Sequence, residues 1–440
     1  MKFSKYNLFI PFEGDYLLVN TMNGTLYRVS DDIKVAIEQN KMEKLDENIV
    51  KDYYERGIVI DDHIEESRIL KYLHNKEKYC TKVLSLTILL TMECNFSCVY
   101  CFEGSKTYQK KYLKDKEMEC ITKFITNMLN EDKNIELVSI TLFGGEPLLN
   151  LRKCSGWLEK VREICENKKK EFVMGIITNG SLLSEESLDI LERCKCQTIQ
   201  VTLDGTKEIH DSRRFYRDGR GSFDDVISAI KMIKEKSGLA APIIRININR
   251  TNIGCIEELL EYLAENNLND CVVDFGIIKA GNNENEEYKS KCFGNNELGE
   301  ILEGLWKSMQ RLGYNINVQP MRTNLSCGLY SDKSFTIAPD GSVYKCWEYV
   351  EDSRFYLGKL SPKGMINDIS YHLFDWMTKE FDENAACTHC VYLPVCGGGC
   401  AAVSFEKNKS IHTQGCHKVR GVFEAKVKLS YIESVIRKNK

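Results

Sequence analysis

Residues 91–104 read TMECNFSCVYCFEG and place Cys94, Cys98 and Cys101 in a C-x3-C-x2-C spacing. The loop directly follows an apolar run, Val83 to Leu90, which is typical of a buried strand. Three thiolates in one short loop can bind three irons of a cubane iron–sulfur cluster, and no fourth cysteine follows at ligand spacing. The spacing therefore predicts a cluster with one open iron, where a small molecule can react. A zinc site or chance clustering is the alternative, although zinc sites more often use paired C-x2-4-C motifs.

This loop opens a long region in which strand-like apolar runs alternate with amphipathic helical segments. The expected strands are 83–90, 137–143, 172–178, 198–203, 243–249 and 271–277, and the expected helices are 115–129, 152–166, 184–193, 223–236, 256–265 and 298–312. Such alternation predicts an α/β fold whose parallel strands are joined by right-handed crossovers. Periodicity alone leaves open whether the sheet is flat or curved into a partial barrel.

Glycines and polar residues that could bind a ligand follow the ends of these strands. They are Gly144, Gly145 and Glu146 in a GGEP motif, Thr178 and Asn179 in TNG, Thr202 with Asp204 in TLDG, and then Asn247 and Asn249. Because ligands bind at the carboxyl edge of parallel α/β sheets, we expect these motifs to form one site. The glycine pair would let backbone approach a ligand, and Glu146 could accept a hydrogen bond from an ammonium group. A purely structural role is the alternative for Thr202 and the two asparagines.

A charged segment follows the fourth expected strand, with His210, Asp211 and Arg214 in an HDxxR pattern and then GRGSF at 219–223. We interpret it as a wall of the site or as a helix entry, because a charged loop is more often solvated than catalytic. The polar stretch 281–300 is expected to be a lid or an insertion, and it carries Cys292. No side chain stands out as a general base.

A second set of cysteines lies near the C-terminus. Its spacing is C-x13-G-x4-C, then C-x2-C-x5-C-x3-C, then one more cysteine, which together are Cys327, Cys346, Cys387, Cys390, Cys396, Cys400 and Cys416. Zinc is an alternative for the C-x2-C part taken alone. Nineteen cysteines in a chain of 440 residues indicate metal ligation more than disulfides.

The length and composition limit the classes of protein to which this chain can belong. The length predicts two to three domains, and 43% hydrophobic with 28% charged residues is ordinary for a soluble chain. A net charge of −4 argues against a large nucleic-acid surface. The N-terminus has acidic residues where a signal peptide needs an apolar run, and no run approaches 18 apolar residues. We therefore expect a cytoplasmic protein without a membrane segment.

Residues 1–75 have the pattern of a small separate domain. Strand-like runs at 15–19 and 25–29 flank Asn23-Gly24, which is a two-residue hairpin signal, and helices are expected at 31–38 and 47–56. A short strand at 57–60 and a helical linker at 65–82 follow, and 417–440 is expected to be a closing helix with one solvated face. Because residues 1–75 hold no catalytic constellation, they are expected to bind a partner, with a packing role as the alternative.

The Cys94 loop, with Tyr100 before its last cysteine, resembles the signature of the radical S-adenosylmethionine (SAM) enzymes. The resemblance implies a six-stranded partial (β/α)6 TIM-like barrel and a 4Fe-4S cluster on Cys94, Cys98 and Cys101. SAM would chelate the open iron and be cleaved to a 5'-deoxyadenosyl radical that abstracts a substrate hydrogen. The SAM contacts implied by the family motifs are Tyr100, Gly144, Gly145, Glu146, Thr178, Asn179 and Thr202.

The later cysteine array resembles the SPASM domain of radical SAM peptide maturases. The resemblance implies two more 4Fe-4S clusters, an auxiliary cluster I on Cys327, Cys346 and Cys400, and an auxiliary cluster II whose ligands are Cys387, Cys390, Cys396 and Cys416. Cluster I would then have only three ligands. Either one iron is open to a substrate thiolate or Cys292 completes the set.

Residues 1–75 resemble a RiPP recognition element, a winged-helix-like domain that binds the leader of a ribosomally made peptide as an added strand. We therefore expect a recognition element at 1–75, a radical SAM barrel at 76–315 and a SPASM domain at 316–440. The order is similar to that of ranthipeptide and sactipeptide maturases, which link a cysteine sulfur to a peptide carbon. The expected partners are a precursor peptide and an electron donor such as flavodoxin or ferredoxin, with neither nucleic acid nor membrane.

Three other functions fit parts of this pattern. They are a radical SAM enzyme that forms a carbon–carbon crosslink or makes another peptide edit, a sulfatase-maturing enzyme, and a non-catalytic iron–sulfur carrier or scaffold. Sulfatase maturation leaves residues 1–75 unexplained and lacks the additional cluster I cysteine, because no cysteine lies between Cys327 and Cys346. The GGEP motif and the open-iron loop argue against a scaffold.

Overall fold

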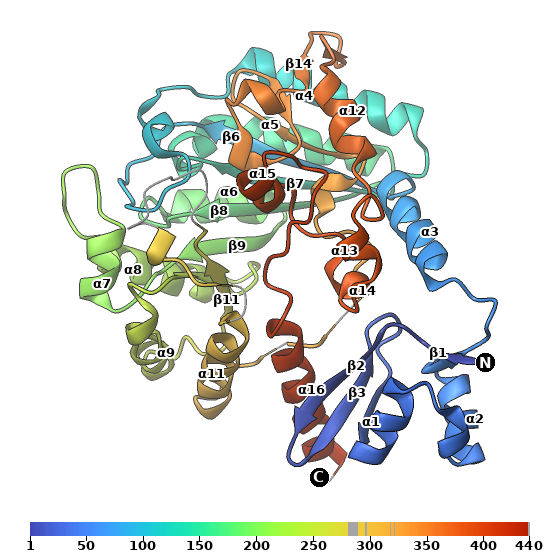
Figure 1. The fold of residues 1–440 in the computed structure, drawn as a ribbon. Coiled ribbons are helices and arrows are strands. Elements are labelled where there is room, and N and C mark those ends of the chain that lie inside the picture. Colours follow the sequence, from blue (N-terminus) through green and yellow to red (C-terminus); the bar gives the residue numbers. More distant parts are fainter. Residues whose placement is uncertain (280–288, 295–296, 317, 321, 439–440) are drawn as a thin grey trace.

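A computed structural model describes the chain except residues 280–288, 295–296, 317, 321 and 439–440. Strands form a ten-stranded sheet, a three-stranded sheet and a two-stranded pair, with helices packed around them (Figure 1). Residues 281–288 and 295–296 of the expected lid or insertion fall outside the described part. Within the described residues, none of the helices combines the length and apolar character needed to cross a bilayer.

Six parallel strands stand side by side in sequence order in the large sheet. They are β6 (Val83–Thr91), β7 (Leu137–Gly144), β8 (Glu171–Thr178), β9 (Cys196–Thr202), β10 (Ile243–Ile248) and β11 (Val272–Ile277). Each corresponds to one of the expected strands. The prediction of an α/β fold with a parallel sheet is confirmed.

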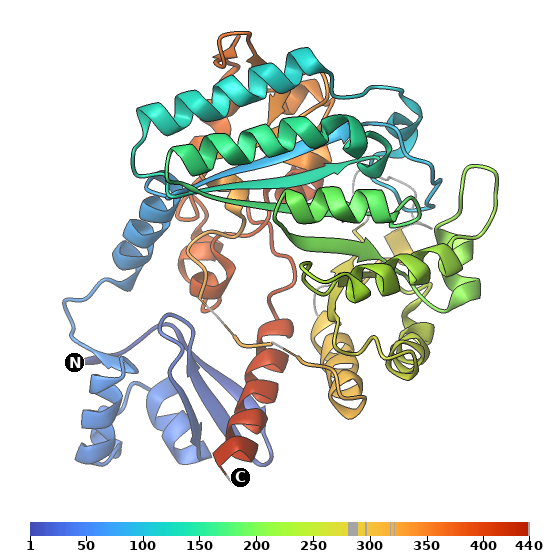
Figure 2. The same cartoon turned by 180° about the vertical axis from the view of Figure 1, so that it is seen from behind.

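Helices connect these strands and cover the sheet. They are α4 (Asp115–Glu131), α5 (Leu148–Asn167), α6 (Glu185–Arg193), α7 (Lys207–Arg213), α8 (Phe223–Glu235), α9 (Ile256–Glu265) and α11 (Leu298–Arg311). Figure 2 shows the helices of residues 115–193 lying along one face of the sheet, as right-handed crossovers require. Burial alternates along β7, where Val138, Ile140 and Leu142 are fully buried in the main hydrophobic core. The short helix α7 is not among the expected helices; it contains the start of the HDxxR segment.

The C-terminal region extends the same sheet from its other edge. Strand β12 (Ser334–Ile337) pairs in parallel with β6, and β13 (Ser342–Tyr344), β14 (Gly358–Leu360) and β15 (Ile366–Asn367) follow in antiparallel order. The later helices are α12 (Tyr371–Thr378), α13 (Ala385–Thr388), α14 (Leu393–Cys396), α15 (Ala401–Asn408) and α16 (Val422–Lys438). This extension places Cys346, just after β13, on the same sheet as the Cys94 loop.

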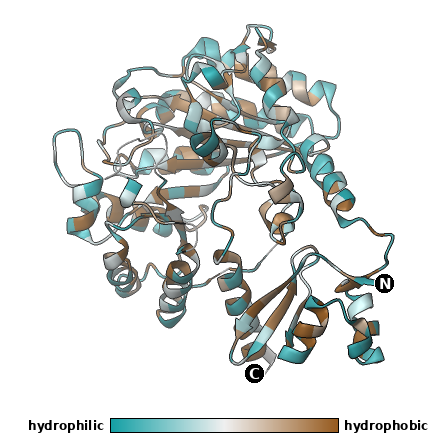
Figure 3. Cartoon of the chain, in the orientation of Figure 1, coloured by the Kyte–Doolittle hydropathy of each residue, from teal (hydrophilic) through white to brown (hydrophobic). Residues whose placement is uncertain are grey.

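The N-terminal region forms its own small sheet. Strands β2 (Asn7–Phe12), β3 (Asp15–Asn20) and β4 (Leu26–Val29) are antiparallel in the order β2-β3-β4, and β1 (Lys2–Phe3) pairs with β5 (Val59–Ile60). The helices are α1 (Asp31–Glu38), α2 (Glu47–Glu55) and α3 (Glu66–Tyr79). The turn at Asn23-Gly24 is where the sequence predicts it, but the connection is longer than two residues, because the Asn20 amide bonds the Thr25 carbonyl across it. In Figure 3 the strands of this sheet are largely brown, the colour of hydrophobic residues.

This sheet packs against the end of the chain. One hydrophobic cluster joins Ile10 and Leu17 of the sheet to Phe423 and Val427 of α16. The expected closing helix therefore exists, and its apolar face covers the N-terminal sheet.

Candidate active site at the carboxyl edge of the parallel sheet

The Cys94 loop leaves the end of β6 and brings its three cysteines together. Cys94 is buried, and Cys98 and Cys101 are half-buried. Burial raises the pKa of Cys94, and the nearby Glu146, Cys98 and Cys101 raise it further. Burial, Glu103 and Cys98 raise the pKa of Cys101 to about 11. Cys98 and Cys101 lie in one turn, where the Cys101 amide donates to Cys98 O at 3.2 Å.

The two glycines of GGEP hold the cysteine loop against β7. A Cβ at Gly144 would lie 2.1 Å from the Thr91 carbonyl oxygen, and one at Gly145 would lie 2.4 Å from that of Glu93. The Gly145 amide donates to Thr91 O at 3.1 Å. Only glycine permits this approach, so these residues pack backbone on backbone.

Glu146 organises the neighbouring strand end. Its carboxylate is fully buried and accepts from Thr178 Oγ1 at 2.7 Å, the Asn179 amide at 2.7 Å and the Leu148 amide at 2.9 Å. Burial raises the pKa of Glu146, and these hydrogen bonds oppose the rise. These three bonds occupy three of the roughly four acceptor positions of the carboxylate.

Asn179 links the same strand end to the cysteine loop. Its Nδ2 lies 3.9 Å from Cys94 Sγ and donates to Asn95 Oδ1 at 2.8 Å. The structure therefore joins Cys94, Gly145, Glu146, Thr178 and Asn179 through direct contacts, as the convergence argument predicts. Thr202, also a predicted SAM contact, is the buried last residue of β9.

Tyr100 is the centre of a buried polar network that the sequence reasoning did not assign. Its hydroxyl donates to the Asp204 carboxylate and accepts from Arg214 Nη1 at 2.7 Å and Asn247 Nδ2 at 3.2 Å. Asp204 Oδ1 also accepts from the Asn247 amide at 2.8 Å. The Arg213 guanidinium lies over the Tyr100 ring, 5.1 Å from its centroid. The signal was present in the TLDG and HDxxR motifs, but neither motif indicates that the two meet at Tyr100.

The HDxxR segment shapes α7 and the start of α8. The Asp204 amide donates to His210 Nδ1 at 3.1 Å, so the neutral ring carries its proton on Nε2, which lies 3.0 Å from Ser222 Oγ. Burial, Arg214 and Arg213 all lower the pKa of His210. Asp211 Oδ1 accepts from the Ser222 and Phe223 amides at the start of α8. The interpretation as a helix entry is confirmed.

The C-terminal cysteines fall into two groups. Burial raises the pKa of Cys346 well above the usual range, and Glu348, Cys400 and Cys327 add to the effect. Burial raises the pKa of Cys396 to about 12, with further contributions from its neighbours Cys416, Cys387 and Cys390. The two groups meet where the Cys400 amide donates to Gly415 O at 2.9 Å. The membership of the two predicted ligand sets remains a prediction.

Direct contacts tie the Cys94 loop to the segment after Cys346. Lys106 Nζ donates to Val350 O at 2.6 Å, and Gln109 Nε2 donates to Glu351 Oε2 at 3.1 Å. Three aromatic rings connect the same two segments. The ring of Phe102 stacks on that of Phe143 with 6.4 Å between centroids, and the centroids of Phe143 and Trp347 are 5.9 Å apart. Phe102 follows Cys101 and Trp347 follows Cys346 in sequence. The segment that follows Cys346 is therefore held beside the Cys94 loop.

These cysteine groups fit iron–sulfur clusters in their donor chemistry. Across the described residues, no three or more His, Cys, Asp or Glu side chains form a group suited to hold a metal ion. Most of their thiols are buried or half-buried, with Cys416 exposed, and a coordinating metal deprotonates such thiols. Cys292 is held near the end of β10, because the carbonyl of its neighbour Lys291 accepts a hydrogen bond from the Arg250 amide. Burial raises the pKa of the Cys292 thiol.

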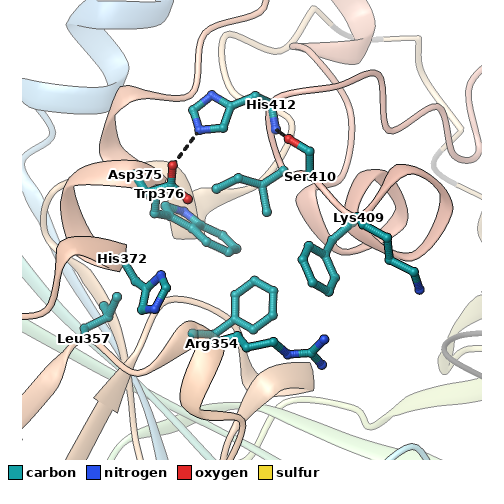
Figure 4. Close-up of a pocket in the computed structure, with 11 residues that line it drawn as sticks. Arg354, Leu357, His372, Asp375, Trp376, Lys409, Ser410 and His412 are labelled. Atoms are coloured by element: carbon teal, nitrogen blue, oxygen red, sulfur yellow. Dashed lines mark hydrogen bonds and ion pairs between the residues drawn. The ribbon is translucent and has the colours of Figure 1, made fainter.

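A separate cavity of about 210 Å³ lies in the C-terminal region (Figure 4). Phe355, Trp376 and Phe405 form its apolar lining, and His412 Nε2 pairs with Asp375 at 3.0 Å on its rim. Behind it, Tyr349 stacks on Phe355 at 3.8 Å. None of the predicted site residues lines this cavity.

The chain is an α/β protein whose parallel sheet carries a three-cysteine loop at its carboxyl edge. Residues 88–263 match the family model of the radical SAM superfamily, so this part of the chain is a radical SAM domain. The radical SAM cyclopropyl synthase TigE of Paramaledivibacter caminithermalis is 21% identical, and the alignment covers 93% of this chain and 91% of TigE.

Two solved structures share the fold. The native anSMEcpe structure with bound AdoMet superposes with a TM-score of 0.65 and 20% identity, covering 81% of this chain and 100% of that one. The crystal structure of Streptococcus suis SuiB bound to precursor peptide SuiA gives a TM-score of 0.52 and 18% identity, covering 96% of this chain and 100% of SuiB. The second likeness therefore includes the N-terminal region.

Proposed function

We propose that this radical SAM enzyme forms thioether crosslinks between a cysteine sulfur and a carbon of a ribosomally made precursor peptide. The observation that carries the proposal is the group of Cys327, Cys346 and Cys400, which has three cysteines where a cubane has four irons. A substrate thiolate can fill the remaining position. The SuiB structure bound to precursor peptide SuiA supports a peptide substrate, because the likeness covers 96% of this chain.

In this proposal three 4Fe-4S clusters and SAM are bound. Cys94, Cys98 and Cys101 hold the first cluster, and the residues that contact SAM are Tyr100, Gly144, Gly145, Glu146, Thr178, Asn179 and Thr202. When bound, the reduced cluster and SAM supply a 5'-deoxyadenosyl radical that removes a hydrogen atom from the substrate. Glu146 and Asn179 keep the loop in register with β8, and Tyr100 orients it through Asp204 and Arg214.

The net reaction removes two hydrogens from the peptide. A C–H and an S–H bond break and one C–S bond forms, the C–H hydrogen leaves as 5'-deoxyadenosine, and the thiol proton goes to solvent. One electron must then leave the substrate. The cysteine groups Cys327/Cys346/Cys400 and Cys387/Cys390/Cys396/Cys416 are suited to hold its acceptors, and a flavodoxin or ferredoxin would supply the electron that starts the reaction.

Residues 1–75 are proposed to bind the leader of the precursor at an edge of the three-stranded sheet. Glu13 and Gly14 have φ values of 49° and 82°, a type I′ turn, so Phe12 and Asp15 form a hydrogen-bonded pair. Hydrogen-bonded and non-hydrogen-bonded pairs alternate along an antiparallel ladder, so the pair of Phe9 and Leu18, three positions further on, is not hydrogen-bonded. The backbone N–H and C=O of Phe9 therefore point away from β3. This free edge of β2 borders a cavity of about 550 Å³ shared with α1.

A pair of proline variants tests which edge takes the leader. Phe9→Pro removes an outward N–H of β2, and Arg28→Pro does the same on β4, whose Arg28 also faces outward. We expect Phe9→Pro to weaken binding of a fluorescent leader peptide by about tenfold or more, and Arg28→Pro by less than about twofold. The opposite pattern would move the leader to β4, and loss of neither would refute strand addition.

The chemistry is tested by mass spectrometry. Anaerobically reconstituted protein is incubated with SAM, a reductant and the cysteine-containing peptide encoded beside its gene, with and without thiol alkylation. Loss of two hydrogens with one fewer alkylatable thiol is the expected result. Loss of two hydrogens with every thiol intact would indicate carbon–carbon crosslinking, and absence of 5'-deoxyadenosine would indicate a non-catalytic role.

The proposed open iron of a cluster held by Cys327, Cys346 and Cys400 has its own test. In a Cys292→Ala variant we expect the iron content and the spectrum of that group to be unchanged. Loss of one cluster would make Cys292 its fourth ligand and remove the site proposed for the substrate thiolate.

A further inference from the structure

One wall of the cavity beside β2 comes from the other end of the chain. The cavity is lined by Phe9 and Pro11 of β2, by Lys34 and Glu38 of α1, and by Val391. Val391 directly follows Cys390, so it belongs to the loop that carries the second C-terminal cysteine group. The groove proposed for the leader is thus not confined to residues 1–75.

Two hydrogen bonds hold this cysteine loop against the N-terminal region. Thr21, which is only 2% exposed, donates through Oγ1 to Val391 O at 2.6 Å. Lys5 Nζ donates to Thr388 O at 3.3 Å. These bonds fall on either side of Cys390, and the first of them is partly buried.

Apolar packing reinforces the same contact. Tyr6 and Leu70 of the N-terminal region share a hydrophobic cluster with Leu393, and the half-buried Cys387 packs against it. Since packed interiors transmit small displacements, the position that Cys387 and Cys390 adopt sets the position of Val391 in the groove wall.

We infer that the leader groove is a composite site, in which the Cys387–Cys396 loop supplies one wall and its binding of a cluster strengthens leader binding. The inference rests on the proposed leader-binding role of residues 1–75 and on the fit of this cysteine group to a cluster. Linkage makes the effect reciprocal, so the bound leader also strengthens retention of iron by this loop.

Two threonine variants of the full-length, reconstituted enzyme test the inference. Thr21→Val keeps the side-chain shape but removes the bond to Val391. Thr25→Val is the matched control, because Thr25 Oγ1 donates to Arg56 O within the N-terminal region. With a fluorescent leader peptide as the probe, we expect Thr21→Val to weaken binding by about fivefold or more and Thr25→Val by less than about twofold.

A second readout needs no variant. Transfer of iron from the wild-type protein to a chelator is followed with and without saturating leader, and we expect the leader to slow one fraction of the release. Equal leader affinity in both variants together with leader-independent release would overturn the composite site while leaving leader binding at β2 intact. Failure of the wild-type protein to bind the leader at all would overturn the leader-binding role, and the composite site with it.

Discussion

At the scale of single residues, Tyr100 couples the cysteine loop to two strands of the parallel sheet. Its hydroxyl meets Asp204 at the end of β9, Asn247 on β10 and the buried Arg214 guanidinium. An aromatic residue before the last cysteine is visible in the sequence, but its partners lie 104 to 147 residues away and no local pattern predicts them.

Replacing Tyr100 with Phe tests this coupling. The change leaves Asp204 and Arg214 with unmet hydrogen bonds in a buried place, so we expect the free energy of unfolding to fall by about 1 to 3 kcal/mol. Tyr216→Phe is the control, because its hydroxyl bonds Asp225 at the surface, and we expect it to change stability by less than about 0.5 kcal/mol. Denaturant unfolding of both variants under anaerobic conditions measures the difference, and equal stabilities would contradict the network's role.

Gly145 provides a second test at this scale. An alanine Cβ there would approach the Glu93 carbonyl oxygen to 2.4 Å, and backbone cannot move aside as a side chain can. We expect Gly145→Ala to displace the cysteine loop and lower 5'-deoxyadenosine formation by about tenfold or more, which corresponds to about 1.4 kcal/mol or more.

The control for Gly145→Ala is Gly156→Ala in α5, where a Cβ meets nothing within 4 Å. We expect this variant to keep its activity and to be more stable by about 0.5 to 1 kcal/mol, since alanine favours a helix interior. Full activity in Gly145→Ala would mean that the loop tolerates a shift at this contact.

At the scale of elements, the sequence predicts what repeats and misses what is irregular. The six parallel strands and their helices follow from long apolar runs and 3.6-residue periodicity, and all of them are present. Strand β2 was missed because Pro11 breaks its pattern, a residue that a sheet edge tolerates. Strands β12 to β15 were missed because they are only two to four residues long.

Helix α16 gives the prediction that belongs to this scale. Phe423 packs between the N-terminal sheet and the C-terminal region, so Phe423→Ala is expected to cost about 3 to 5 kcal/mol of local stability. Amide hydrogen exchange should then become faster in β2 and β3 than in β7. Val435→Ala, at an exposed position on the same helix, should leave exchange unchanged, and uniform protection in both variants would refute the packing argument.

At the scale of the whole molecule, the cysteine motifs predict ligand sets but say nothing of how the N-terminal region packs against the C-terminal region. The boundaries 1–75, 76–315 and 316–440 remain predictions. The structure adds that the N-terminal region shares hydrophobic clusters with Phe423, Val427 and Leu393. Such contacts join residues more than 300 positions apart along the chain, so no periodicity within either segment could predict them.

Deleting residues 1–75 should therefore do more than remove leader binding. The deletion uncovers Phe423, Val427 and Leu393, and an apolar surface of this kind promotes association. We expect the truncated protein to elute from size exclusion as aggregates, whereas full-length Phe9→Pro elutes like the wild type. A truncated protein that matches the wild type in dispersity, corrected for its mass, would mean that the two parts are independent.

The bond between Thr21 and Val391 also bears on how such enzymes can be re-engineered. If residues 1–75 are the leader-binding module that we propose, a module cut at residue 75 and exchanged for another would lack the Thr21 contact to the loop around Cys390. The exchange would then disturb the cluster site that we propose at that loop. Retargeting is better done by recoding the groove-facing positions of β2 and α1 while the Thr21 hairpin and the sheet face against α16 are kept.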